Sequence, residues 1–363
     1  MKRSKGIERL RNYLFLRSFL EKCGNNVVFL CGDVSRDFCE EMAYVAKSMN
    51  RQSRCFEVIK EQQRRKIGEV AERKEIRNIL GFLTRSKTLR KFLLFFVRSK
   101  VDKEVIKSVK DCDAVVWVGL HEDFDVFYLT DKRVVDNILN KSFLFLSFPS
   151  RSTAEILGTN YGDYWKTFFD ALNYPWEKIK ASGEALREQL LNNKTLKVTS
   201  PQGTDFTVNF KEENIHLFYG ILNEKALDDG KIQLQLPAGE LFIEVEEPKV
   251  EGKMFFDVPR ILDGKLLSNV TVTVENGNVT GFHSQRGESI LGKFFEQKRS
   301  RTVKEIGFGL NAAIKPCGSI YIDEKAYKTI HVGFGELAML GHIDLVMSNP
   351  TVYVNEKCLK WEI

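Results

Sequence analysis

The residues best suited to chemistry lie in one stretch near the C-terminus. His331 ends a short β-branched run, and His342 and Asp344 follow with one residue between them. Residues two apart on an extended strand point to the same side, so this imidazole and this carboxylate would face one point. Neutral imidazole and carboxylate are ligands of first-row divalent metals. The stretch alone leaves two interpretations open, which are a metal site and two unrelated histidines near a strand.

Two further carboxylates stand at defined corners of the chain. Leu236-Pro-Ala-Gly-Glu240 ends an alternating strand, and Pro and Gly stop that strand and fix the loop. Glu305 begins the glycine-rich apolar segment Glu305-Ile-Gly-Phe-Gly-Leu-Asn311, where its side chain would be partly enclosed. A buried carboxylate without a partner is costly, and a metal, an arginine or backbone amides would each satisfy it.

Together these segments offer three carboxylates and two imidazoles: Glu240, Glu305, His331, His342 and Asp344. This is more than a single catalytic zinc with an open position needs. The set suits a two-metal site, in which a carboxylate bridges ions about 3.5–4 Å apart. Such a site activates water at neutral pH and polarises a carbonyl group. Glu324 lies beside the set in sequence and is either an acid/base group or an ordinary turn residue.

The predicted secondary structure differs between the first and second halves of the chain, and the first half alternates strands and helices. Apolar runs at 26–31, 54–59, 113–119 and 141–147 predict buried strands, and helical spacing predicts helices over 35–49, 61–110 and 164–192. Strand, helix and strand in this order predict a parallel sheet. His121-Glu-Asp123 follows the third strand and indicates a surface loop or a ligand site.

Short strands follow at close intervals after residue 194. Residues 204–210, 231–236 and 241–245 alternate or are rich in β-formers, and Asn276-Gly277 predicts a hairpin turn within 270–282. We therefore expect an α/β domain with a mostly parallel sheet over 1–193. A β-rich α+β metal-binding catalytic domain over 194–363 should follow it.

Composition places the chain among ordinary globular proteins. Its 363 residues fit two domains, and 43% are hydrophobic and 29% charged. No apolar run is long enough to span a bilayer and no signal-peptide core follows Met1, so we expect a cytoplasmic protein without a membrane partner. The seven cysteines form no Cys-x-x-Cys pair, which argues against disulfides and a zinc knuckle and for reduced, mostly buried thiols.

Charge is unevenly distributed along the chain. The first 100 residues hold 24 Lys and Arg against 11 Asp and Glu, although the net charge of the whole chain is only +6. Such an excess can bind an acidic partner or simply form the solvated faces of helices. No RNA-binding signature or zinc finger accompanies it, so a nucleic-acid partner is not expected.

The second half resembles the aminopeptidase T family of thermophilic metallo-aminopeptidases. Short strings match the family's motifs in the family's order over roughly residues 195–354. They are Ser200-Pro-Gln-Gly-Thr-Asp205, Leu236-Pro-Ala-Gly-Glu240, Val274-Glu-Asn-Gly277, Glu305-Ile-Gly-Phe-Gly-Leu-Asn311, Asp323-Glu-Lys325 with Thr329-Ile-His331, and His342-Ile-Asp344. The first half is similar to the family's N-terminal domain more loosely, through the strands near Val27 and at 113–119.

The resemblance implies a homodimeric aminopeptidase that removes N-terminal residues from peptides through water activated by two zinc or cobalt ions. The five residues named above would be the ligands. We expect Glu305 also to pass the proton to the leaving group, because its glycine-flanked segment can approach the metals closely. The chain departs from the family between His331 and His342, where only ten residues intervene. Ala338 stands where the family has an active-site tyrosine, so a slow enzyme is expected.

Two alternatives remain open on sequence. Ring-cleaving dihydroxypyridine dioxygenases look like distant relatives and hold one ferrous ion with two histidines and an aspartate, a triad that His331, His342 and Asp344 could form. This interpretation leaves Glu240 and Glu305 without a role. The other alternative is a non-catalytic protein that keeps the fold and binds a partner through its basic half.

Overall fold

The computed structural model describes residues 14–32, 35–59, 103–119, 137–138, 140–221, 227–245, 250–262, 264–335 and 342–361. The chain forms two compact units. The first comprises Met1–Ser150 and Ile221–Leu236, and the second comprises Arg151–Gly220 and Pro237–Ile363. Among the described residues, no helix is long and apolar enough to cross a membrane.

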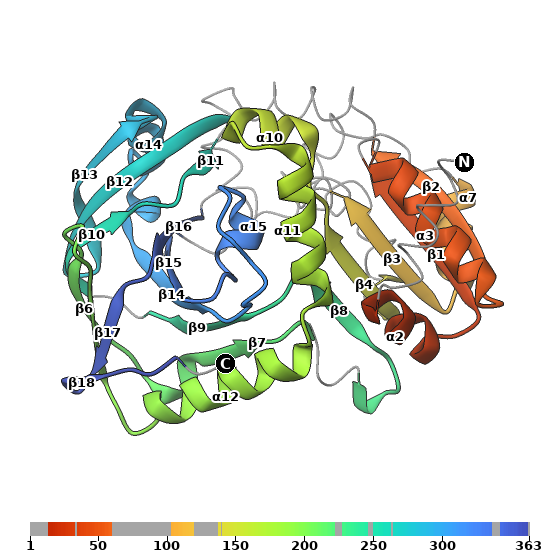
Figure 1. Cartoon of the computed structure of the whole chain (residues 1–363), viewed down its shortest axis with the longest axis horizontal. Coiled ribbons are helices and arrows are strands. Elements are labelled where there is room, and N and C mark those ends of the chain that lie inside the picture. The colour runs from red at the N-terminus through yellow and green to blue at the C-terminus, as the bar shows by residue number, and fades with distance from the viewer. Residues whose placement is uncertain are drawn as a thin grey trace, which may run out of the picture. The chain divides into compact units, whose positions relative to one another are not determined.

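The first unit is built on a parallel sheet of five strands (Figure 1). In spatial order the strands are β2 (Gln52–Ile59), β1 (Asn26–Gly32), β3 (Ala114–Gly119), β4 (Ser142–Ser147) and β8 (Gln233–Leu236). Every neighbouring pair runs parallel. The side chains of β3 and β4 are buried throughout, as expected for a parallel sheet covered on both faces.

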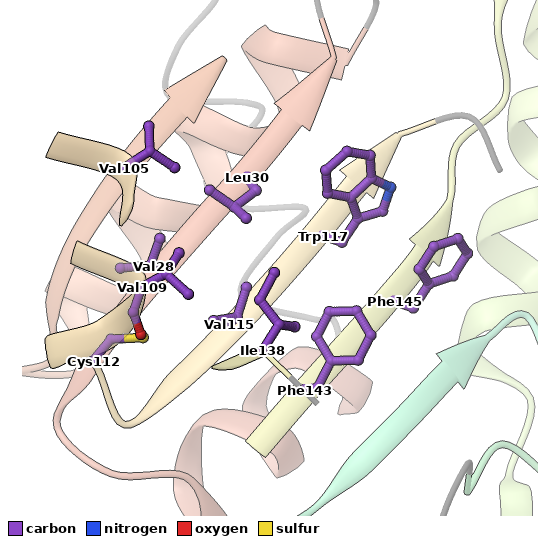
Figure 2. Packing of buried hydrophobic residues seen from close by; sticks show 10 residues of the cluster. All are labelled: Val28, Leu30, Val105, Val109, Cys112, Val115, Trp117, Ile138, Phe143 and Phe145. Carbon is purple, nitrogen blue, oxygen red and sulfur yellow. The ribbon is translucent and has the colours of Figure 1, made fainter. Parts of the chain in front are cut away.

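Helices cover this sheet. They are α2 (Leu14–Lys22), α3 (Arg36–Ser48) and α7 (Lys103–Asp111). Figure 2 shows Val105 and Val109 of α7 beside Val28 and Leu30 of β1, with Trp117 of β3 in the same cluster. Alternate residues of β1 thus face α7, while Phe29 and Cys31 point to the opposite face of the sheet. The strand–helix–strand unit and the parallel sheet expected from the sequence are confirmed.

The second unit holds two antiparallel sheets and most of the remaining helices. In spatial order, the larger sheet contains β11 (Arg260–Leu262), β12 (Lys265–Glu275), β10 (Val250–Phe256), β6 (Asp205–Asn209), β5 (Thr195–Thr199), β17 (Thr351–Val354) and β18 (Lys357–Cys358), and β13 (Asn278–Arg286) pairs with β12. The smaller sheet contains β16 (Ile343–Ser348), β15 (Thr329–Phe334), β14 (Val303–Gly309), β9 (Glu240–Glu244) and β7 (Ile215–Phe218).

The helices of this unit are short. They are α10 (Arg151–Leu157), α11 (Tyr161–Asn173), α12 (Trp176–Leu190), α14 (Glu288–Phe295) and α15 (Ile320–Asp323), with 3-10 turns at Glu212–Asn214 and Lys298–Arg301. α12 packs on β7 and β9 of the smaller sheet. The β-rich second half is confirmed, and Asn276 and Gly277 both have positive φ at the expected hairpin turn.

Two sequence expectations differ from the structure. The single helix expected over 164–192 is two helices. Pro175 has no backbone N–H to donate to a helical hydrogen bond, and it holds Tyr174 extended at φ −67° and ψ 129°. The domain boundary expected near residue 193 also differs from the division into compact units. Helices α10 to α12 belong with the second unit, and β8 returns to the parallel sheet of the first.

Some expected features lie outside the described residues. These are most of the helical region 61–110, the His121-Glu-Asp123 segment, and residues 336–341 with Ala338. More than half of the basic residues in the first hundred positions fall between 60 and 102, which is also outside the described part of the chain.

Candidate metal centre

The smaller sheet of the second unit brings the predicted ligands to one face. Directly paired residues of antiparallel strands share a face, and so do residues two apart on one strand. Glu305 pairs with Gly333, which pairs in turn with Asp344 of β16. His331 pairs with Gly307, and Glu240 pairs with Gly309, two residues further along β14. Four strands therefore present their carboxylates and imidazole on the same side.

The opposite face of these strands is apolar, which fixes the register. Ile306 and Phe308 of β14, Ile330 and Val332 of β15, and Leu345 of β16 are all buried. A slip of one residue would exchange this apolar face for the charged one, so the core holds the polar side chains in place.

Two glycines make the room for the imidazoles. A Cβ atom at Gly307 would lie 1.9 Å from Cε1 of His331, and one at Gly333 would lie 2.6 Å from Cε1 of His342. Both distances are far inside van der Waals contact. Gly307 of β14 and Gly333 of β15 thus form a cradle that larger residues would fill.

Glu240, Glu305 and His331 form the tighter group. The Nε2 atom of His331 lies 3.0 Å from Oε1 of Glu305 and 3.8 Å from Oε2 of Glu240. One potential ligand atom from each of the three residues lies within 4.8 Å of the other two. His331 is 1% exposed, and its Nδ1 atom has no hydrogen-bond partner among the described residues.

His342 and Asp344 form a second pair, as their spacing predicts. Nε2 of His342 lies 2.8 Å from Oδ1 of Asp344, and Nδ1 of His342 is 3.1 Å from the carbonyl oxygen of Gly335. Because that carbonyl accepts a hydrogen bond from Nδ1, Nε2 is the nitrogen left to face the carboxylate. Asp344 and His331 interact electrostatically, which links this pair to the first group.

Two cations that the sequence analysis did not assign also lie in the site. Lys325 is buried, with Nζ 3.5 Å from Oε1 of Glu240 and in contact with Glu324. Arg260 of β11 lies with Nη1 3.9 Å from Oδ2 of Asp344 and also donates to the Asp344 backbone carbonyl. Lys325 adjoins a motif that the sequence analysis noted, whereas no sequence signal connects Arg260 with a residue 84 positions away.

The electrostatics of the site follow from burial and close opposite charges. Burial raises the pKa of Glu240 to about 7, although Lys325 opposes this. Burial lowers the pKa of His331, but its hydrogen bond to Glu305 and the charge of Glu240 outweigh that and raise it to about 10. Burial raises the pKa of Asp344, but His342 outweighs this and lowers it to about 2.

A buried asparagine fixes the loop that precedes Glu240. Nδ2 of Asn311 donates to the carbonyl oxygens of Ala171 in α11, at 3.2 Å, and Ala238, at 2.9 Å. Its Oδ1 accepts from the backbone of Ala313. Asn311 is fully buried, so these bonds connect α11, the start of β9 and the end of β14 without competition from water.

The donor set of this face fits divalent ions. Glu240, Glu305 and His331 converge, and the His342–Asp344 pair interacts with them electrostatically. A cradle of glycines keeps space for the imidazoles, and a buried ring nitrogen of His331 is without a partner among the described residues. Oxygen and imidazole donors of this kind suit zinc, cobalt, manganese and iron. Glu240, Glu305 and His331 are the residues that the geometry alone groups most closely.

The fold and this face define a class of protein. The chain belongs to the thermophilic metalloprotease (M29) family, whose model matches residues 137–340, more than half of the chain. The resemblance inferred from the motifs is therefore confirmed. The matched region includes three of the five predicted ligands and ends two residues before His342.

Individual relatives are more distant. Aminopeptidase AmpS of Bacillus subtilis (strain 168) is 26% identical over 95 residues, which is 26% of this chain and 22% of the relative. The chain thus spans about a fifth of the length of that curated relative. Wild-type AmpT from Thermus thermophilus is 15% identical with a TM-score of 0.59, and the match covers 94% of each chain.

The solved structure of a protein with a different activity is equally similar in fold. The 2,5-dihydroxypyridine dioxygenase of Pseudomonas putida KT2440 is 16% identical with a TM-score of 0.58, covering 99% of this chain and 96% of its own. Both structural likenesses establish the fold, an α/β unit combined with a β-rich unit, and neither separates the two activities.

Proposed function

We propose that this protein is a metal-dependent aminopeptidase that removes N-terminal residues from peptides with the help of two divalent ions. Membership of the metalloprotease family supports peptide hydrolysis, and the similarity to aminopeptidase AmpS supports action at the N-terminus. The observation that carries the proposal is the convergence of Glu240 and Glu305 on His331, beside the His342–Asp344 pair.

The five residues have distinct roles in this proposal. Glu240, Glu305, His331, His342 and Asp344 would hold two ions, zinc or cobalt. When bound, such a pair polarises the scissile carbonyl and makes a water acidic enough to attack near neutral pH. Lys325 and Arg260 offset part of the carboxylate charge and hold Glu240 and Asp344 in place.

Glu305 is the proposed proton carrier. Its carboxylate is 9% exposed and Oε1 lies 3.0 Å from Nε2 of His331, at the centre of the polar face. A carboxylate in this position can take a proton from the attacking water and pass it to the leaving amine. Glu240 is oriented by Lys325 and serves as a ligand.

The dioxygenase alternative explains less of the site. A single ferrous ion on His331, His342 and Asp344 would leave Glu240 and Glu305 without a function. Yet these two carboxylates lie within 3.8 Å and 3.0 Å of Nε2 of His331, closer than chance alignment of surface acids would bring them. The carboxylates therefore favour hydrolysis over ring cleavage, although the fold suits both.

The test is an assay of the zinc- and cobalt-loaded protein on short peptides with free or acetylated N-termini. Free peptides should lose one residue at a time and acetylated ones should stay intact. The wild type should be slower than relatives with the family's tyrosine by about 10²–10³-fold, as for loss of one oxyanion-hole donor. Absence of hydrolysis with either metal, in a protein that holds both ions, would contradict the proposal.

A variant isolates the proposed proton carrier. Glu305→Gln should lower kcat by about 10²–10⁴-fold, the usual contribution of a general acid or base. Glu275→Gln changes an exposed carboxylate on β12 of the larger sheet and should leave kcat unchanged. The homodimer that the family resemblance implies is a separate expectation, and light scattering of the purified protein will check it.

A further inference from the structure

Three cysteines far apart in sequence converge in the first unit. Cys31 is the penultimate residue of β1, Cys39 lies in the first turn of α3 and Cys55 lies in β2. Their sulfur atoms all lie within 4.8 Å of one another, and those of Cys39 and Cys55 are 3.1 Å apart. The cluster lies outside residues 137–340, so the metalloprotease match does not account for it.

The topology of the parallel sheet produces this convergence. Cys55 pairs with Phe29, and Cys31 is two residues beyond Phe29 on the same strand. Cys31 and Cys55 therefore share one face of the sheet, opposite the face that Val28 and Leu30 present to α7 in Figure 2. α3 packs on β1 and β2 and supplies the third sulfur.

The first turn of α3 brings a helix N-terminus and the Arg36 guanidinium to the cluster. Cys39 lies at the N-terminal end of the 13-residue helix α3, where the helix dipole stabilises thiolates. The Arg36 guanidinium lies beside the cluster, 3.0 Å from Glu40 and 3.1 Å from Glu57.

We propose that Cys31, Cys39 and Cys55 form a binding site for one soft divalent cation, of which zinc is the representative. The inference rests on the convergence of three sulfurs on one point and is independent of the proposed peptidase function. As the ion binds, the three thiols release their protons to solvent and three sulfur–metal bonds form. A fourth position then stays open to water.

The distances fit such an ion. With Zn–S bonds of about 2.3 Å, two sulfurs on a tetrahedral ion are about 3.8 Å apart. The observed contact of 3.1 Å and the limit of 4.8 Å bracket that value, so small side-chain movements complete the geometry. Cys31 and Cys39 are fully buried, whereas Cys55 is partly exposed and provides the route for the ion.

Cobalt spectroscopy separates this site from the carboxylate–imidazole face. The reduced, metal-free protein is titrated with Co²⁺ without oxygen, and sulfur-to-cobalt charge-transfer absorption is recorded. The face that holds Glu240 contains no sulfur and is silent in this band. We expect the band to saturate at one ion per chain. A band that is still absent after three equivalents, enough to fill the carboxylate–imidazole face as well, overturns the proposal.

Matched variants assign the band to the cluster. Cys55→Ser should weaken cobalt binding by more than about 100-fold, because even loss of a supporting group outside the ligands costs 10–100-fold. Cys358→Ser, at an exposed cysteine in β18, should leave the titration unchanged. An unchanged titration in Cys55→Ser, or a lost band in Cys358→Ser, would refute the assignment.

A measurement on the unaltered chain does not depend on how the variants fold. One equivalent of Zn²⁺ should slow alkylation of Cys55 at least tenfold and leave that of Cys358 unchanged, as read by peptide mass mapping. Equal rates for Cys55 with and without zinc contradict the site. A Cys39–Cys55 disulfide in the freshly purified protein would show a thiol pair instead and would also overturn the proposal.

Discussion

At the scale of single residues, the proton on His331 competes with any cation that binds the site. Its pKa of about 10 means that the imidazole carries a proton at neutral pH when no metal is bound. A metal ligand must be neutral, so binding has to displace that proton. The same hydrogen bond to Glu305 that raises the pKa therefore makes metal affinity strongly dependent on pH.

This argument gives a pH prediction with a definite sign. Between pH 6.5, the ordinary pKa of histidine, and about 10, metal affinity should rise about tenfold per pH unit. Isothermal titration in buffers of different ionisation enthalpy measures both the affinity and the protons released near pH 7.5. If the metal affinity is constant over this range and no proton is released, metal binding does not remove the proton from His331.

The glycine cradle gives a second prediction at this scale. Gly307→Ala places a methyl group where the His331 ring lies, so the ring must leave the point it shares with Glu240 and Glu305. Metal content and kcat should both fall by at least tenfold. Gly281→Ala is the matched control on a strand of the larger sheet, because its Cβ would meet Thr273 at an ordinary 3.8 Å. Full activity in Gly307→Ala would contradict the cradle.

Residue types and local spacing were enough to predict part of the site. The i, i+2 relation of His342 and Asp344 survives as a hydrogen-bonded pair, and Glu305 lies beside its glycines as expected. Arg260 could not be predicted, because its contact with Asp344 depends on how β11 and β16 are placed. The three-cysteine cluster was not predicted either, because Cys31, Cys39 and Cys55 meet only through the packing of α3 on β1 and β2. Short Cys-x-x-Cys spacing does not indicate such a cluster.

At the scale of elements, Asn311 is the residue that joins the parts of the site. Asn311→Ala would leave the part-buried N–H of Ala313 and the buried carbonyl of Ala238 without this partner. We expect the free energy of unfolding to fall by about 1–3 kcal/mol, the cost of an unsatisfied buried group. Metal affinity should fall as well, because the loop that positions Glu240 loosens.

Urea denaturation measures this loss. The control is Asn209→Ala, at an exposed position of β6, which should change stability by less than about 0.5 kcal/mol. If Asn311→Ala were as stable as the control, the hydrogen bonds that connect α11, β9 and β14 would not contribute to the free energy of unfolding.

Elements with a clear hydrophobic period were predictable, and those interrupted by a single residue were not. The buried runs of β1, β3 and β4 match their expected ranges within one residue at the ends. The expected helix over 164–192 failed at Pro175, where the proline is a stronger local signal than the apolar spacing on either side. The pairing order of the antiparallel strands depends on contacts remote in sequence.

At the scale of the whole molecule, the chain forms two cores, and the segments of the two cores alternate along the sequence. β8 completes the parallel sheet before Pro237 leads into the second unit, so no single boundary divides the chain. The change near residue 194 from helical patterns to closely spaced strand patterns marks where the strands of the second core begin. The three preceding helices, α10 to α12, also belong to the second core. Composition cannot show this, because helices serve either unit equally well.

The two cores give a prediction for thermal unfolding. A ligand that binds only the folded state stabilises it by about 2.7 kcal/mol at 100 times its dissociation constant. In a Cys55→Ser background, zinc should therefore raise the unfolding temperature of the second unit and leave that of the first unchanged. We expect two transitions in differential scanning calorimetry, one for each core, and an equal shift of both would contradict a site confined to the second unit.

The most direct measurement of the central claim is the number of ions held by the carboxylate–imidazole face. Zinc per chain is determined by elemental analysis after dialysis, in the Cys55→Ser background so that thiols do not contribute. The account predicts about two ions, and loss of at least one in both His342→Ala and Asp344→Ala. A parent protein that holds none, or variants that keep the full content, would contradict it.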